Sequence, residues 1–261
     1  MKIPLYQVDA FTSKLFSGNP AAVCLLEEWI DDATLQSIAA ENNLSETAFL
    51  VENDTGFDLR WFTPAVEVAL CGHATLASAF VLFNCREWAG ASIRFQTRKS
   101  GELVVTRLKG LYEMDFPARP IHGIDPPPGL FEALGVKGGD VYGSEEDLML
   151  VLDSEKRVQA LTPDMGMLEK VECRGVAVTA RGDRSDFVSR FFGPRVGVPE
   201  DPVTGSAHCM LIPYWGGVLK KKDVFARQVS KRGGEVYGRD CKDRVRISGG
   251  AVLYSEGVLT A

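Results

Sequence analysis

Residues 70–83 read Leu-Cys-Gly-His-Ala-Thr-Leu-Ala-Ser-Ala-Phe-Val-Leu-Phe, and this stretch indicates how the chain folds. The run Ala74–Phe83 is rich in alanine, apolar nearly all round and longer than a typical strand, so it predicts a helix. A helix without a polar face has to be buried on every side. We therefore expect strands to wrap around this helix, with a polar turn at Gly72 leading into it.

A second stretch with the same layout lies in the C-terminal half. Glu200-Asp-Pro-Val-Thr-Gly-Ser-Ala-His208 is again a polar, glycine-centred turn that opens onto an apolar segment. Gly72 and Gly205 are 133 positions apart, about half of the 261 residues. A similar interval separates each glycine from a preceding Phe-x-Pro segment, Phe62-Thr-Pro64 and Phe192-Gly-Pro194. This internal self-match predicts a duplicated lobe.

Short strand-like runs dominate the rest of the chain, and a stretch rich in proline and glycine, Pro120–Pro128, separates the two halves. The sequence thus predicts two lobes, residues 1–117 and 118–261, with the last few residues free to join the first lobe. Helices are expected at Ala33–Glu41, capped by Asp31 or Asp32, and at Leu130–Leu134. Strands are expected at Ile3–Phe11, Ala21–Leu26, Thr47–Glu52, Phe57–Phe62, Ser92–Thr97, Glu102–Leu108, Tyr112–Phe116, Leu148–Leu152, Val176–Thr179 and Phe187–Phe192, and in a closing set of hairpins at Ala226–Ser230, Val236–Arg239, Val245–Ser248 and Ala251–Ser255.

The composition argues against several classes of partner. Hydrophobic residues make up 45% and charged residues 25% of the chain, and the formal net charge is −6. A negative net charge gives no electrostatic reason to expect nucleic acid. No apolar run approaches the roughly 20 residues that a membrane helix needs, and the N-terminus is too polar for a signal peptide. We therefore expect a cytoplasmic protein that binds neither nucleic acid nor membrane.

The cysteines and histidines show no spacing typical of a metal site. The six cysteines are scattered without a Cys-x-x-Cys pair, which favours free thiols in a reducing compartment. The three histidines lie far apart, and neither a Gly-x-Gly-x-x-Gly nor a Walker-type loop occurs. These patterns give no sign of a metal site and argue against a nucleotide cofactor, although a metal site could still assemble in three dimensions.

The two glycine-centred turns have the chemistry of an anion-binding site. The start of a helix presents unpaired N–H groups and the positive end of the helix dipole, and glycine lets a ligand approach the backbone closely. Taken singly, each turn is more simply an ordinary capped helix. Two such turns, one in each lobe, suit the carboxylate of a small substrate.

Three side chains near these turns could carry chemistry, although each has an ordinary structural interpretation. Asp201 precedes the second turn, where an aspartate is most often a helix cap. His73 lies in the first turn of the predicted helix and can carry a proton, but a lone histidine is more often structural. Glu46 lies where a helix gives way to a strand and would by itself be a surface carboxylate. In a closed cleft, such a carboxylate can give and take a proton.

Five segments together resemble the hallmark segments of the PhzF-like phenazine-biosynthesis family, which shares the diaminopimelate epimerase fold. In chain order they are Ser17-Gly-Asn-Pro-Ala-Ala-Val23, Asn43-Leu-Ser-Glu-Thr-Ala-Phe49, Phe62-Thr-Pro64, Cys71-Gly-His-Ala-Thr75 and Glu200-Asp-Pro-Val-Thr-Gly-Ser-Ala207. They follow the family's order and span nearly the whole chain. The resemblance implies an α+β protein of two pseudo-symmetric diaminopimelate-epimerase-like lobes. Each lobe is a strongly curved, mainly antiparallel sheet around a central apolar helix, with the active site between the lobes.

The resemblance also implies an activity and the residues that perform it. In the family's characterised isomerase, a glutamate moves a proton within trans-2,3-dihydro-3-hydroxyanthranilate, without a metal or organic cofactor and usually in a homodimer. By motif, this glutamate is Glu46, and the supporting histidine and aspartate are His73 and Asp201. The substrate-binding positions carried over in the same way are Asn19, Gly72, His73, Ala74, Gly205 and Ser206. A cofactor-independent isomerase acting on a small carboxylate is therefore the expected function.

Two alternatives stay open at the level of sequence. Epimerases and racemases of this fold use two cysteines, one before each glycine turn, and here Cys71 occupies the first place but Thr204 the second. A threonine hydroxyl is far too weak an acid to replace a thiol, so a two-thiol racemase is disfavoured. An amino-acid or hydroxy-acid racemase that uses Cys71 with another partner is one alternative. The other is a non-catalytic metabolite-binding or interaction protein of the same fold.

Overall fold

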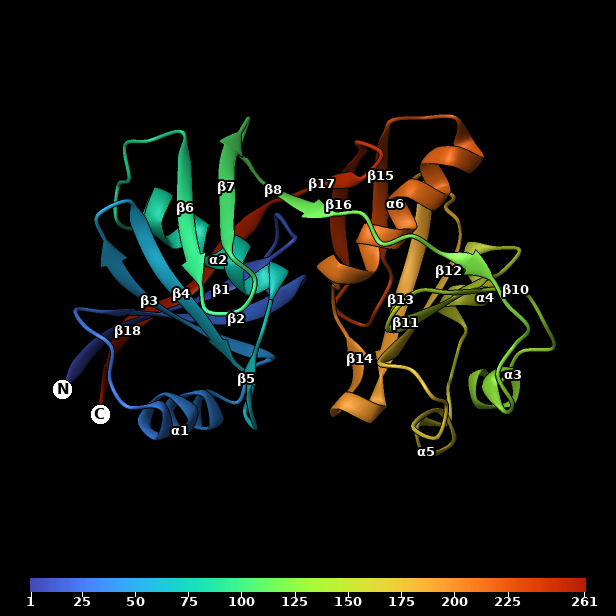
Figure 1. Cartoon of the computed structure of the whole chain (residues 1–261), viewed down its shortest axis with the longest axis horizontal. Helices are drawn as coiled ribbons and strands as arrows, with labels where there is room; N and C mark the ends of the chain where they lie inside the picture. Colours follow the sequence, from blue (N-terminus) through green and yellow to red (C-terminus); the bar gives the residue numbers. More distant parts are fainter. The chain divides into compact units, whose positions relative to one another are not determined.

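The chain divides into two units, and the computed structural model describes residues 1–261. The first unit comprises Met1–Asp115 together with the C-terminal segment Ser248–Ala261, and the second is the continuous stretch Phe116–Ile247 (Figure 1). The chain therefore passes from one unit to the other twice. None of its helices combines the length and the apolar character needed to cross a membrane.

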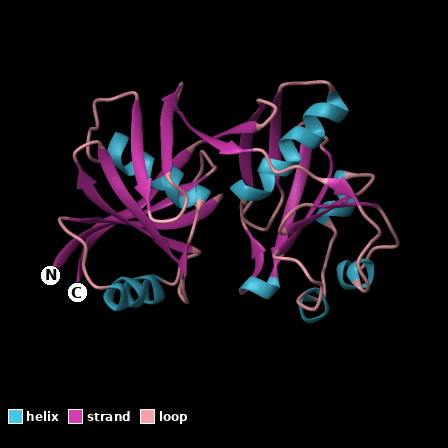
Figure 2. Cartoon of the chain, viewed as in Figure 1, coloured by secondary structure: helices cyan, strands magenta, loops and turns pink.

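The first unit is mainly a sheet with two helices, α1 and α2 (Figure 2). Its elements are β1 (Lys2–Ala10), β2 (Asn19–Leu26), α1 (Asp32–Asn42), β3 (Glu46–Asn53), β4 (Gly56–Phe62), β5 (Glu67–Val68), α2 (Gly72–Asn84), β6 (Ser92–Thr97), β7 (Glu102–Leu108), β8 (Leu111–Pro117) and β18 (Ala251–Thr260). Only β2–β3 and β4–β6 pair in parallel. The other pairings, β1–β2, β1–β18, β3–β4, β4–β5, β6–β7 and β7–β8, are antiparallel.

Helix α2 lies inside the sheet of the first unit. It contacts β1, β2, β3, β7 and β18, and its residues from His73 to Phe83 are buried with the exception of Phe80. The two buried hydroxyl groups of the helix form hydrogen bonds within the helix. Thr75 donates to the carbonyl of Cys71 at 2.6 Å, and Ser78 donates to that of Ala74 at 2.7 Å. The expectation of an apolar helix wrapped by strands is confirmed.

The second unit contains the remaining elements, and helix α6 is its longest helix (Figure 2). Its elements are β9 (His122–Gly123), α3 (Leu130–Leu134), β10 (Asp140–Gly143), β11 (Asp147–Val151), α4 (Glu155–Gln159), α5 (Met165–Leu168), β12 (Gly175–Arg181), β13 (Phe187–Gly193), the 3-10 turn η1 (Pro194–Val196), β14 (Val198–Asp201), α6 (Gly205–Leu219), β15 (Asp223–Gln228), β16 (Gly234–Asp240) and β17 (Arg244–Gly249). As in α2, most side chains of α6 are buried.

The two units repeat one order of strand pairings. In the first unit, β2–β3 is parallel, β3–β4 antiparallel and β4–β6 parallel, with α2 between β5 and β6. In the second, β11–β12, β12–β13 and β13–β15 follow the same order, with α6 between β14 and β15. The predicted fold class, two pseudo-symmetric α+β lobes with central apolar helices, is confirmed.

An ion pair is repeated along with the strands. Arg60 on β4 binds both carboxylate oxygens of Glu67 on β5, at 2.7 and 2.9 Å. Arg190 on β13 binds Glu200 on β14 with the same two distances. Each guanidinium also lies over the ring of the phenylalanine two residues further along its strand, 5.0 and 4.8 Å from the ring centres of Phe62 and Phe192.

The structure corrects three details of the prediction. The segment Ala251–Ser255 does not close a hairpin set in the second half, because it belongs to β18, which pairs with β1. Asp201 does not cap α6, because Thr204 occupies the N-cap position. Several elements of two to five residues were not predicted, since so few residues show no periodicity; they are β5, β9, β10, β14, α4 and α5.

Candidate active site

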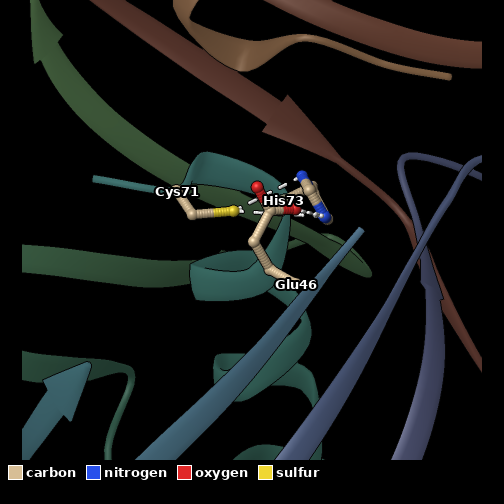
Figure 3. Close-up of side chains that lie close together, drawn as sticks. All are labelled: Glu46, Cys71 and His73. Atoms are coloured by element: carbon tan, nitrogen blue, oxygen red, sulfur yellow. Dashed lines mark hydrogen bonds and ion pairs between the residues drawn. The ribbon is translucent and has the colours of Figure 1, made fainter. Parts of the chain in front are cut away.

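Glu46, Cys71 and His73 lie together at the start of helix α2 in the first unit (Figure 3). His73 is in the first turn of α2, Cys71 occupies its N-cap position, and Glu46 is the first residue of β3. Glu46 comes to this place because Asn43 ends α1 in the left-handed conformation, with φ 47°, and β3 then runs beside β2. Folding therefore joins residues that are more than 20 positions apart in the sequence.

The imidazole of His73 is held on both of its nitrogens. Its Nε2 lies 3.0 Å from Oε2 of Glu46, while Nδ1 lies 3.2 Å from Nδ2 of Asn19 and 3.5 Å from Sγ of Cys71. His73 and Cys71 are only 5% and 6% exposed, whereas the side chain of Glu46 retains 17%. Glu46 is thus the member of the group that a substrate can reach most easily.

Burial and neighbouring charges act on His73 in opposite directions. Burial lowers the pKa of His73, but Cys71 and Glu46 raise it, and the resulting pKa lies well above the ordinary value. Burial and the Glu46 carboxylate raise the pKa of Cys71 to about 11, so this thiol is neutral at neutral pH. Cys71 and Glu46 thus both favour a proton on the His73 ring.

Asn19 reaches His73 because of a turn that only glycine fits. Gly18 has φ +69°, and a Cβ at this position would lie 2.1 Å from the carbonyl oxygen of Ala10. The next residue, Asn19, is fully buried, begins β2 and pairs with Ala10 of β1. The Ser17-Gly-Asn-Pro segment thus places an amide that orients the imidazole.

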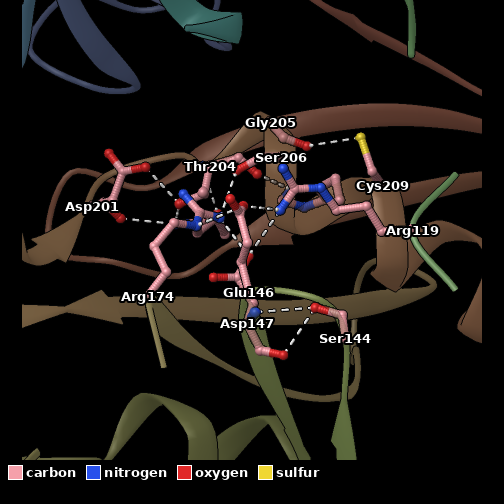
Figure 4. A network of polar contacts seen from close by, with 12 residues as sticks. Arg119, Ser144, Glu146, Asp147, Arg174, Asp201, Thr204, Gly205, Ser206 and Cys209 are labelled. Carbon is pink, nitrogen blue, oxygen red and sulfur yellow. Dashed lines mark hydrogen bonds and ion pairs between the residues drawn. The ribbon is translucent and has the colours of Figure 1, made fainter. Parts of the chain in front are cut away.

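At the start of α6 in the second unit, Thr204 is held by two side chains (Figure 4). Its hydroxyl donates to Oδ2 of Asp201 at 2.6 Å. Gln228 on β15 accepts from the backbone N–H of Thr204 at 2.9 Å and donates to the carbonyl of Asp201 at 2.7 Å. Asp201 is therefore tied to the helix start through Thr204 and Gln228.

Four charged side chains lie next to Ser206, also at the start of α6 (Figure 4). Arg174 donates to Oγ of Ser206 at 3.1 Å and also binds Asp147. Arg119 binds Asp147 at 3.3 Å and Glu146 at 3.1 Å. Burial raises the pKa of Asp147, and the two arginines counteract this effect. The buried carboxylate of Asp147, 1% exposed, thus holds Arg174 beside Ser206.

A proline inside α6 positions Arg119. Pro213 has no N–H, so it cannot donate to the carbonyl of Cys209 four residues earlier. That carbonyl instead accepts the backbone N–H of Arg119 at 3.1 Å. The free carbonyl is therefore used to attach the segment that carries Arg119 to the helix.

Comparison with known proteins places the chain in a family. The family PhzC-PhzF, described as phenazine biosynthesis-like protein, matches residues 8–257. The chain belongs to this family. An uncharacterized isomerase of Pseudomonas aeruginosa is 53% identical to it over 99% of both chains. A crystal structure of a PhzF family protein from Enterococcus faecalis is similar with a TM-score of 0.97, at 47% identity over 100% of both chains.

A more distant structure shares the fold alone. A probable proline racemase from Agrobacterium radiobacter has a TM-score of 0.64 at 10% identity, and the match covers 99% of this chain and 93% of that one. The PhzC-PhzF chain described here therefore has a fold that also occurs in racemase-like proteins, as the resemblance to the diaminopimelate epimerase fold implied.

In this PhzC-PhzF chain the expected site residues fall into two groups. The first unit holds Asn19, Glu46, Gly72, His73 and Ala74, of which His73 contacts both Glu46 and Asn19. The second unit holds Asp201, Gly205 and Ser206, and Asp201 contacts the α6 start through Thr204. Arg119, Asp147, Arg174 and Gln228 were not predicted from the sequence.

The two helix starts carry different partners. His73 and Ser206 are each the second residue of their helix, α2 and α6. In the first unit, a carboxylate at the start of β3 binds His73, whereas in the second, an arginine directly before β12 binds Ser206. One helix start thus has a carboxylate–imidazole pair, Glu46 and His73, and the other has an arginine, Arg174, which also binds Asp147.

Proposed function

We propose that the protein is a cofactor-independent isomerase that moves a proton within a small carboxylate-bearing substrate, with Glu46 as the general acid and base. The observation that carries this proposal is the 3.0 Å contact between Oε2 of Glu46 and Nε2 of His73 at the start of a buried helix. Relatives that cover nearly the whole chain are named isomerases, which supports this class of enzyme.

Glu46 removes a proton from one carbon of the substrate and returns it to another in this proposal. The Nε2 of His73 lies 3.0 Å from one carboxylate oxygen of Glu46, and an N–H there holds this oxygen, which leaves the other oxygen for the substrate. Asn19 fixes the orientation of the imidazole ring from its far side. Because the acid and the base are the same group, the proton need not be lost to solvent in every turnover.

In this proposal, the start of α6 binds the carboxylate of the substrate. Its first backbone N–H groups, at Gly205 and Ser206, attract an anion. Arg174, held beside Ser206 by Asp147, adds a positive charge close to the same amides. Asp201 orients the substrate or relays the proton, and Gln228 and Thr204 keep its position.

Deuterium uptake from heavy water tests the role of Glu46. The protein is incubated with a panel of small carboxylates, including dihydrohydroxyanthranilate and common amino acids, and mass spectrometry follows the label. We expect label in one compound and a loss of about 10²–10⁴-fold in its rate with Glu46→Gln. Glu52→Gln is the matched control, since Glu52 is an exposed glutamate on the same strand, β3. Label that persists in Glu46→Gln contradicts the assignment.

A racemase that uses Cys71 is the second candidate, because Sγ of Cys71 lies 3.5 Å from Nδ1 of His73. The pKa of about 11 argues against it, since the thiol carries its proton at neutral pH and is a poor base. The same experiment separates the two functions. Label at a chiral α-carbon that is lost with Cys71→Ala and kept with Glu46→Gln indicates the racemase. A ligand that raises the melting temperature without any label indicates a binding protein.

A further inference from the structure

Two arginines of the second unit, Arg119 and Arg174, share two carboxylates of unequal burial (Figure 4). Asp147 binds both guanidinium groups through Oδ2. Oε2 of Glu146 lies 3.1 Å from Nη1 of Arg119 and 3.5 Å from Nε of Arg174. The side chain of Asp147 is 1% exposed, whereas that of Glu146 is 50% exposed. Asp147 is therefore a fixed part of the cluster, while Glu146 can turn away into solvent.

The backbone that carries Glu146 is fixed by strand pairing. Strands β11 and β12 run parallel, and Asp147 pairs with Gly175. Glu146 and Arg174 each precede one of these residues, and the backbone N–H of Arg174 donates to the carbonyl of Glu146 at 2.7 Å. The Glu146 side chain can change rotamer while this backbone stays in place. Ion pairs of exposed side chains contribute little stability, so an external anion has only a small interaction to replace.

The cluster has a hydrogen-bond donor that Glu146 does not satisfy. Nε of Arg174 is shielded from solvent and makes no hydrogen bond, although the Glu146 carboxylate lies 3.5 Å away. A buried N–H without an acceptor is costly. The charges favour the same replacement, because two guanidinium groups face two carboxylates and the cluster gains one net positive charge when Glu146 leaves. An acidic group of a ligand, placed against Arg119 and Nε of Arg174, would satisfy the donor and restore the balance of charge.

The same cluster adjoins the start of α6, which binds the substrate carboxylate in the proposed function. Nη2 of Arg174 donates to Oγ of Ser206 at 3.1 Å, while Nε of the same guanidinium lies beside Glu146. A ligand anchored on the first amides of α6 therefore has a second cationic position next to it. A ligand with one acidic group leaves this position to Glu146 and gains nothing from Arg119.

We propose that Arg119 and Arg174 form a subsite for a second acidic group of the substrate, and that the Glu146 carboxylate occupies this subsite until the substrate displaces it. The inference rests on the role proposed above for the start of α6, and it names the class of substrate, a dicarboxylate. Glu146 marks the position of the second carboxylate, since one of its oxygens already lies between the two guanidinium groups.

Isothermal titration calorimetry tests the subsite with probes that differ by one charge. The probes are the straight-chain dicarboxylates from malonate to adipate, each paired with its monoamide, which has the same length but one acidic group. We expect at least one dicarboxylate to bind about tenfold or more tightly than its monoamide, because hydrogen bonds to charged groups are strong enough for this factor. Arg119→Gln should abolish the preference. Titration requires no turnover, so it tests the subsite even if the deuterium experiment contradicts the role of Glu46.

Two neighbouring glutamates provide a matched pair of variants, which keeps the test valid if Arg119→Gln does not fold. Glu146→Gln removes the competing carboxylate, so the affinity for the dicarboxylate should rise about two- to fivefold while that for the monoamide stays the same. Glu145→Gln makes the same change of charge at the adjacent exposed residue and should alter neither affinity. The proposal is wrong if no dicarboxylate binds more tightly than its monoamide, or if Glu146→Gln and Glu145→Gln have equal effects.

Discussion

At the scale of single residues, His208 couples the stability of the second unit to pH. It is completely buried, its Nδ1–H donates to the carbonyl of Thr204 at 2.8 Å, and its Nε2 has no partner. Burial lowers the pKa of His208 from 6.5 to about 4. Between these two values the unfolded chain binds the proton and the folded chain does not, so stability falls as the pH falls.

We predict that His208→Asn removes this acid sensitivity, because asparagine can keep the hydrogen bond to Thr204 but cannot be protonated. In the wild type, the pKa shift corresponds to a loss of about 3 kcal/mol in the free energy of unfolding as the pH falls from about 6.5 to about 4. Urea unfolding across this range measures the slope. His122→Asn, at an exposed histidine on β9, should leave the slope unchanged. An equally steep slope in His208→Asn would refute the assignment.

At the scale of secondary structure, the two central helices show how one element serves both core and site. Each is apolar because it is buried, yet each begins with polar residues. In α6, Pro213 leaves the carbonyl of Cys209 free for Arg119. A proline normally weakens a helix, and here the missing bond is replaced by a tertiary one.

We predict that Pro213→Ala loosens the attachment of Arg119, because the new N–H can donate to the carbonyl of Cys209. A hydrogen bond contributes about 1 kcal/mol, so exchange of the Arg119 amide with deuterium should become roughly fivefold faster. Hydrogen exchange with mass spectrometry or NMR measures this rate. Pro126→Ala is the control, since it removes an exposed proline from the same unit. An unchanged exchange rate in Pro213→Ala would show that the carbonyl is not the attachment point.

At the scale of the whole molecule, the duplicated ion pairs offer a test of the internal repeat. The side chains of Arg60 and Arg190 are 2% and 12% exposed, and their glutamate partners 21% and 23%. Replacing one partner of a fully buried pair leaves an uncompensated charge, which costs about 3–5 kcal/mol, but Glu67 also has Arg98 at 3.7 Å. The partial exposure of the glutamates reduces that cost.

We predict that Arg60→Met and Arg190→Met each lower the free energy of unfolding by about 2–3 kcal/mol. Their effects should add in the double variant, because the two pairs lie in different units and share no partner. Denaturant unfolding measures all three proteins. Arg94→Met is the control, since Arg94 and Glu102 are 60% and 45% exposed and such pairs contribute less than about 1 kcal/mol. A large effect at only one of the two sites would contradict their equivalence.

Much of the fold could be predicted because its signals are local. The apolar run before Phe83 and the cap at Asp31 act within one element, and both are as expected. Motifs predicted Asn19, Glu46, His73 and Asp201 and the two helix starts, but not the side chains that surround Asp201 and Ser206. The strand pairings align Glu46 with Gly175, so Arg174, one residue earlier, could not be read from the repeat.

The sequence by itself determined the two buried helices, the duplication and the family, because each depends on residues that are close in the chain or repeat at a fixed interval. Only the tertiary structure decided which side chains meet. Glu46, Cys71 and His73 form one cluster, and Arg119, Asp147 and Arg174 another, because strand pairing joins distant segments. No local pattern encodes such contacts, since they arise from the packing of whole strands and helices.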